Sequence, residues 1–174
     1  VRSMNNRSYR ETYSDLFGKN YHKKGVVIDT RFNGGGWLHN DLAVLFNGTK
    51  YVNYYPRGQH FGHDPMNQWT KESIVLMSEG NYSDAHGFPY AYTALDIGKT
   101  VGMPVPGTMT AVWWERLQDP SLVFGIPQVG TKNLEGEYLE NKQLEPDIKV
   151  RQDYSKVSEG IDQQLMKAVE ELME

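Results

Sequence analysis

A serine followed by an aspartate stands where an apolar run gives way to a predicted helix. Ser83 and Asp84 follow residues 73–77, which predict a buried strand, and they open a helix expected over 83–97. A serine at a helix start can present its hydroxyl to a substrate, while the free N–H groups there favour a developing negative charge. The letters alone also allow a plainer role, in which Ser83 or Asp84 only caps the helix.

Three consecutive glycines form a second feature of this kind. Gly34, Gly35 and Gly36 lie between an apolar run at 25–29 and a predicted helix at 37–46. Such a loop lets the backbone approach a ligand and directs amide N–H groups at negative charge. It lacks the Lys-Ser/Thr of a P-loop and the spacing of a dinucleotide fingerprint, which disfavours phosphate, whereas an oxyanion hole uses the same physics. Taken alone, the glycines fit a tight turn at positive φ at least as well.

The elements that position both features alternate as strand, loop and helix. Strands joined through helices are parallel, so 25–29 and 73–77 are expected to be parallel and central in an α/β layer structure. Function is then expected at their carboxyl ends, where both features lie. The other elements expected are a helix ending near Gly18, short strands within 50–55, 101–104, 109–114, 122–127 and 138–139, and an amphipathic helix over 161–173.

Composition excludes several classes of function. The 174 residues are enough for one domain, and no run approaches the roughly 18 apolar residues of a membrane span. A net charge of −4 gives no electrostatic reason to bind nucleic acid. The absence of cysteine excludes disulfides, thiolate nucleophiles and Cys-ligated metals. Because the sequence opens with Val1 and no signal segment follows, we expect it to be a piece of a longer protein.

Four stretches, in this order, resemble the tricorn-like and C-terminal processing serine peptidases, family S41. They are KKGVVIDTRFNGGG, IVLMSEGNYSDAHGFPYAY, GEYLENKQLEPDIKV and IDQQLMKAVEELM, and together they cover nearly the whole chain. The resemblance implies a ClpP/crotonase-like α/β core with a mostly parallel central sheet flanked by helices. Small C-terminal strands and a terminal helix would complete it.

Two branches of that family differ in mechanism, and the sequence resembles one of them. The processing branch uses a Ser/Lys dyad with the lysine in a Gly-Lys-Gly setting, whereas residues 106–112 here read PGTMTAV and Lys99 lies too early. The tricorn-like branch has Ser-Asp, an aromatic-Pro-aromatic stretch and Glu-Asn followed by Pro-Asp. This chain matches with Ser83-Asp84, residues 88–90 and Glu140-Asn141.

The resemblance assigns roles to individual residues. Ser83 is expected to be the nucleophile, with an oxyanion hole made by the amides of Asp84 and of Gly35 or Gly36. Glu140 would orient a catalytic histidine, whose position falls upstream of residue 1. Such roles agree with the chemistry, because a serine needs a base and an imidazole needs an acceptor to hold its tautomer.

The remaining candidates receive lesser roles. Arg57 matches a loop at the active-site rim, and His86 is expected to have a local structural or substrate-lining role. His39 fits an exposed position on an amphipathic helix. His60 and His63 form an isolated HxxH in a Gly-rich loop, which is a weak signal, and we expect no metal and no organic cofactor.

The sequence therefore predicts a serine peptidase that cleaves peptide bonds through an acyl-enzyme. Residues 1–174 would be its single core domain from the C-terminal part of a multidomain protein, inactive in isolation. Expected partners are a peptide or protein substrate, further copies of the chain, and upstream PDZ or β-propeller domains. The alternatives are a peptide-binding scaffold that has lost its triad and a crotonase-type acyl-CoA enzyme. The compartment is open between cell envelope and cytoplasm, with export favoured.

Overall fold

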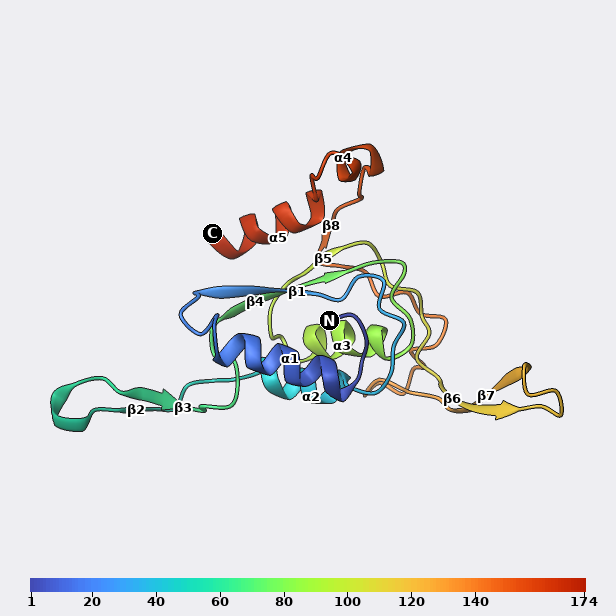
Figure 1. Ribbon diagram of the computed structural model, residues 1–174, viewed down its shortest axis with the longest axis horizontal. Helices are drawn as coiled ribbons and strands as arrows, with labels where there is room; N and C mark the ends of the chain where they lie inside the picture. Colours follow the sequence, from blue (N-terminus) through green and yellow to red (C-terminus); the bar gives the residue numbers. More distant parts are fainter.

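A four-stranded parallel sheet forms the centre of the computed structural model, which describes residues 1–174 (Figure 1). Its strand order is β1 (Gly25–Asp29), β4 (Glu72–Met77), β5 (Thr100–Gly102) and β8 (Ile148–Lys149). The expected α/β class and the parallel pairing of the first two predicted strands are confirmed, with Val27 opposite Ile74. The expectation that both are central was wrong for β1, which lies at the edge of the sheet.

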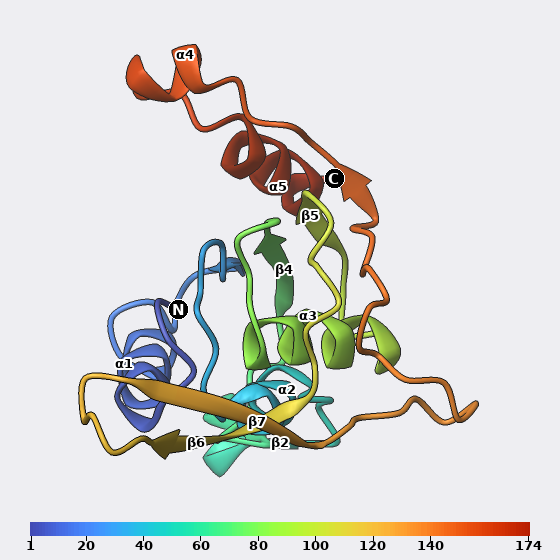
Figure 2. The ribbon, with the colours of Figure 1, turned by 90° about the vertical axis from the view of Figure 1, so that its right-hand side faces the viewer.

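Helices cover both faces of this sheet, and β4 explains why. Val75 joins a core cluster with residues of α1 (Asn6–Phe17), α2 (His39–Phe46) and α3 (Asp84–Ala94). Ile74 and Leu76 point the other way and pack with Ala168 of α5 (Gln163–Met173). Because neighbouring side chains of a strand face opposite sides, an unbroken apolar run is buried on both. Figure 2 shows α5 on one side of the sheet and α1, α2 and α3 on the opposite side.

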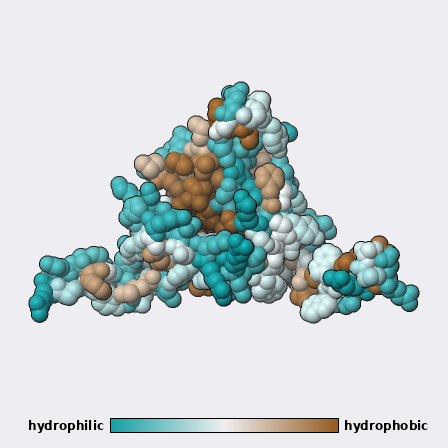
Figure 3. Space-filling view, in the orientation of Figure 1, coloured by the Kyte–Doolittle hydropathy of each residue, from teal (hydrophilic) through white to brown (hydrophobic).

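Two antiparallel hairpins project from the core in opposite directions (Figure 1). One pairs β2 (Val52–Tyr54) with β3 (Gly62–Asp64), and a short 3-10 turn, η1 (Pro56–Gly58), lies between them. The other pairs β6 (Ala111–Arg116) with β7 (Val123–Val129). Both expose apolar side chains, visible as brown surface in Figure 3.

The predicted boundaries differ from the structure where tertiary contacts decide them. The second helix begins only at His39, because the Trp37 N–H still donates to Met4 O, at 2.7 Å, on the N-terminal segment. Tyr138 forms only an isolated bridge with Lys132 rather than a strand. The strands β3 and β8 and the helix α4 (Tyr154–Ser158) were not predicted.

Arg31 ties the segment after β1 to the start of the last helix. Its guanidinium forms ion pairs with Asp29 and Asp162, both at 2.7 Å, and also donates to the Gln164 side chain. These bonds fix the base of the glycine segment against the α5 side of the sheet. None of the helices has the length and apolarity needed to cross a membrane.

Candidate active site

Ser83 occupies an unusual backbone conformation at the start of α3. Its φ of 54° and ψ of −123° lie in a region that non-glycine residues rarely occupy, and such strain concentrates at functional sites. The side chain does not cap α3, so this residue lacks the capping role that the letters alone allowed. Its N–H donates to Thr108 Oγ1 at 3.0 Å, and its hydroxyl makes no capping bond to the helix.

Ser83 lies in the wall of a pocket of about 430 Å³. The glycine loop and the first residues of α2 and α3 form one side, and the β6–β7 hairpin with the segment before it forms the other. Aromatic and apolar side chains from both sides line it, among them Trp37, Met109, Trp114 and Val129. This mixture of apolar walls and a few placed polar groups is typical of a binding site.

Two glycines of the loop, Gly35 and Gly36, lie so close to neighbouring segments that a side chain would not fit. A Cβ on Gly35 would lie 2.8 Å from Ser83 Cβ, and one on Gly36 would lie 2.0 Å from Met4 O. Both glycines have positive φ, of 92° and 143°. The sequence left a tight turn and a close approach as alternatives, and the structure requires glycine for both reasons.

The loop and the start of α3 leave three N–H groups free at this pocket. Gly35 N–H is engaged, since it donates to Asn33 Oδ1 at 2.9 Å. The N–H groups of Gly34, Gly36 and Asp84 have no hydrogen-bond partner within the chain, and all three residues line the pocket. Of the two glycines considered from the sequence, Gly36 is therefore the one with an available donor.

The Asp84 carboxylate caps the neighbouring helix α2 instead of its own. Its Oδ2 accepts from Leu38 N at 2.5 Å and from His39 N at 3.0 Å, and its Oδ1 bonds to His39 Nδ1. Burial alone would raise the pKa of Asp84, but the His39 and Leu38 bonds outweigh it and lower that pKa. The bond to Asp84 raises the pKa of His39, against an opposing effect of burial.

Glu140 holds the segment before β6, which forms the pocket wall opposite the glycine loop. Its Oε2 accepts from Met109 N at 2.8 Å and from Thr110 N at 2.7 Å, and both residues line the pocket. The same segment carries Thr108, which holds Ser83 N. Glu140 therefore fixes the segment on which Ser83 rests without lining the pocket itself.

Two residues expected near the substrate lie elsewhere. His86 is only 1% exposed and does not line the pocket; its Nδ1 has no partner, and burial lowers its pKa. Arg57 lies in the turn of the β2–β3 hairpin, which projects away from the β6–β7 side of the molecule (Figure 1). Neither residue lines this pocket. His86 is buried in α3, which fits the local structural role that was its other expectation, and the hairpin carries Arg57 outward.

Sequence reasoning missed His39 as a residue of the site. Its side chain is 26% exposed, lines the Ser83 pocket and bonds to Asp84. Helical periodicity places it on a polar position and gives no sign of this contact, which joins residues 45 apart in the sequence. The one usable signal was its closeness to the glycine loop.

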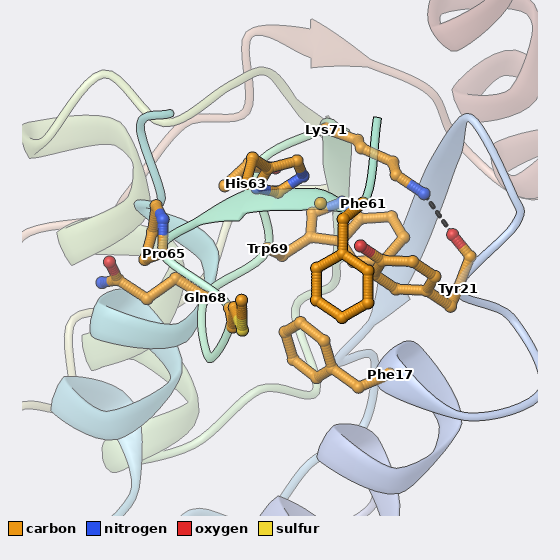
Figure 4. A pocket seen from close by; sticks show the side chains of 11 residues that line it. Phe17, Tyr21, Phe61, His63, Pro65, Gln68, Trp69 and Lys71 are labelled. Atoms are coloured by element: carbon orange, nitrogen blue, oxygen red, sulfur yellow. Dashed lines mark hydrogen bonds between the residues drawn. The ribbon is translucent and has the colours of Figure 1, made fainter. Parts of the chain in front are cut away.

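A second cavity, of about 250 Å³, lies between α1 and the β2–β3 hairpin (Figure 4). It is lined by Phe17, Tyr21, Phe61 and Trp69, with Lys71 at its rim. The Lys71 ammonium donates to the carbonyls of Tyr21 and Lys23 and lies 4.8 and 4.9 Å from the rings of Tyr21 and Trp69. Its charge is thus satisfied within the chain. No three His, Asp or Glu side chains gather to hold a metal here or elsewhere.

Comparisons with known proteins show which family the chain resembles in sequence. The model of the family described as Peptidase family S41 matches residues 1–150. A tricorn protease of Thermoplasma volcanium is 26% identical over 156 residues, covering 85% of this chain. The chain spans only 14% of that relative's length.

Solved structures share the fold of the chain. The crystal structure of the tricorn protease matches all of it with a TM-score of 0.86 at 22% identity, over 17% of that protein's chain. The photosystem II D1 C-terminal processing protease matches 87% of it with a TM-score of 0.62 at 16% identity, over 41% of its own chain.

Proposed function

The chain belongs to peptidase family S41, and on that basis we propose that it is the catalytic core of a tricorn-like serine peptidase, cleaving peptide bonds through an acyl-enzyme. One observation carries the proposal. Ser83, in a strained conformation at a helix start, shares a pocket with the unengaged N–H groups of Gly36 and Asp84. This is the arrangement that acyl transfer needs, a nucleophile beside donors for the developing oxyanion.

The reaction follows from these positions. Ser83 Oγ attacks the carbonyl carbon of the scissile bond and its proton passes to a general base. The carbonyl oxygen becomes an oxyanion that accepts from Gly36 N–H and Asp84 N–H. The tetrahedral intermediate collapses, the amine leaves with the proton returned by the base, and water then hydrolyses the ester by the same steps.

We propose that the base is a histidine upstream of residue 1. The histidine of the chain that lines the Ser83 pocket has its Nδ1 bonded to Asp84, and no hydrogen bond joins it to Ser83. Residues 1–4 run beside the glycine loop, where Met4 N donates to Gly35 O at 3.0 Å, which supports a base supplied from that direction. Glu140 would orient this histidine through Oε1, since Oε2 is occupied by two amides.

The substrate of this proposal is a peptide or a protein. Apolar side chains such as Trp37, Trp114 and Val129 would contact its residues beside the scissile bond. Self-association of the chain is also proposed, since the β6–β7 hairpin exposes Trp113 and Phe124, each at 58%. Upstream PDZ or β-propeller domains belong to the same proposal.

Hydrolysis of a mixture of quenched fluorogenic peptides by the full-length protein tests the proposal. Ser83→Ala should lower the rate at least about a thousandfold, because the nucleophile is lost while the fold remains. Ser121→Ala, in the exposed turn between β6 and β7, is the matched control and should keep the full rate. Peptides that bind the folded protein but are never cleaved would favour the scaffold alternative. Cleavage that survives Ser83→Ala would contradict the proposal.

A further inference from the structure

The two donors assigned to the oxyanion hole come from segments that are separate in the sequence. Gly36 precedes α2, and Asp84 begins α3. An oxyanion hole works only when both donors lie about 2.7–3.1 Å from the oxyanion, so α2 and α3 must keep a fixed relative position at this end. Some contact must therefore hold the start of α2 against the start of α3.

The Asp84 side chain is this link. Its carboxylate accepts from the N–H groups of Leu38 and His39, which stand two and three residues after Gly36. The residue at the cap position of α2, Leu38, has no side chain able to serve, so α2 depends on Asp84 for its cap. Asp84 thus supplies one donor through its own N–H. Its carboxylate also holds the segment in which Gly36 supplies the other donor.

His39 closes the link from the other side. Its Nδ1 bonds to the same carboxylate, at Oδ1, while its ring packs against α3. A Cβ on Gly87 would lie 3.2 Å from His39 Cγ, so the absence of a side chain there makes room for the ring. The ring remains 26% exposed at the pocket, where solvent protons reach it.

We propose that His39 is a positioning residue of the peptidase reaction: in its charged form it locks the Asp84 carboxylate and thereby fixes the Gly36 and Asp84 N–H groups as one oxyanion hole. This inference rests on the proposed function, since it assigns a role in the same site. His39 contacts neither Ser83 nor the reacting atoms in this account and acts only through Asp84.

The proposal sets a direction for pH dependence. The carboxylates that act on His39 are Asp84 of α3, through a hydrogen bond, and Asp41 of its own helix, and both raise its pKa. His39 is therefore charged at low pH and becomes neutral as the pH rises through that raised pKa. The upstream base must be neutral to act, so its contribution rises with pH while that of His39 falls. The two together predict a bell-shaped profile.

The rate of fluorophosphonate labelling of the full-length protein between pH 5 and 9 tests this. His39→Asn keeps a neutral donor at the place of Nδ1, and His39→Leu removes it, while circular dichroism checks that both fold. We expect the wild type to lose rate severalfold on the alkaline side, because His39 then loses its charge. His39→Asn, whose donor is always neutral, should label at every pH at about the rate that the wild type keeps on the alkaline side, without that decline. His39→Leu, which has no donor, should be at least about tenfold slower throughout.

The outcomes separate the two claims. A wild type that labels, with His39→Leu equal to it at every pH, overturns the role of His39 alone. Equal slowing of His39→Leu and His39→Asn, with the alkaline decline kept, would assign His39 only a packing role and also overturns it. A folded wild type that labels at no pH contradicts the proposed function itself.

Discussion

The pocket at Ser83 and the aromatic cavity beside α1 are both hollows lined by tryptophan and other apolar side chains, and each holds hydrogen-bonding groups without a partner. In the aromatic cavity, Lys71 is bonded to two carbonyls and lies against two rings, while the buried Nδ1 of His63 has no partner. In the Ser83 pocket, the N–H groups of Gly36 and Asp84 are unengaged and a serine is held at φ 54°. Only the Ser83 pocket places a strained nucleophile beside free donors, so strain at a reactive side chain distinguishes it better than apolar lining or an unmet hydrogen bond alone.

A matched pair of tryptophans should separate stability from chemistry with the largest effect. Trp69 is 2% exposed in the core beside the aromatic cavity, and Trp37 is 75% exposed in the Ser83 pocket. Trp69→Ala should lower the free energy of unfolding by about 4 kcal/mol without changing the labelling rate of the folded protein. Trp37→Ala should change stability by less than about 0.5 kcal/mol and slow peptide cleavage. Denaturant unfolding and peptide assays measure both, and the reverse pattern would break the comparison.

The glycine loop gives the next largest effect. Gly36→Ala should lower the free energy of unfolding by about 3 kcal/mol, because the new Cβ would lie 2.0 Å from Met4 O at a φ of 143°. Gly34→Ala is the control in the same loop, since nothing lies within 4 Å of a Cβ there. Thermal unfolding compares the two variants. Equal stability would show that the loop relaxes more easily than its contacts indicate.

Ser83→Gly should stabilise the fold while removing the nucleophile. Glycine accepts the φ of 54° without steric strain, a gain of about 1–3 kcal/mol that the greater freedom of the unfolded chain partly offsets. We expect a net gain of about 1 kcal/mol in unfolding free energy and no labelling. Ser83→Ala, which keeps a Cβ, should change stability little. A destabilised Ser83→Gly would mean that the serine conformation carries no strain.

The smallest effect concerns the His39–Asp84 pair and pH. The pKa of His39 is raised on folding, so its contribution is complete below about pH 6.5 and is lost as the pH rises through the folded value. The pKa of Asp84 is lowered, so its contribution is present above about pH 3.9 and is lost as the pH falls through the folded value. The pair should therefore stabilise most between about pH 4 and 6.5. The free energy of unfolding, measured across pH, should decline above this window in the wild type but not in His39→Asn.

The sequence predicted most of the fold because its signals were local. The apolar runs of β1 and β4 and the helical spacing of α1 and α5 correspond to elements in the structure. The edge position of β1 could not be predicted, since strand order depends on which segments pair across the sheet. The two-residue strand β8 is too short to show any periodicity.

Part of the candidate site was also predictable from the sequence. Ser83 and the glycine loop lie together in one pocket because both follow parallel strands at the same edge of the sheet. The choice of Gly36 over Gly35 depends on the bond that Gly35 N–H donates to Asn33, and the place of His39 depends on a carboxylate from another helix. The first depends on the exact conformation of the loop and the second joins residues 45 apart, so neither leaves a pattern in a single sequence.

The most direct test of the central claim is where a fluorophosphonate attaches. The full-length protein would be treated with the probe, weighed intact and digested, and the modified peptide sequenced by mass spectrometry. The account predicts one adduct per chain, on Ser83, absent after heat denaturation. A folded protein that carries no adduct, or one whose adduct lies on another residue, would contradict it.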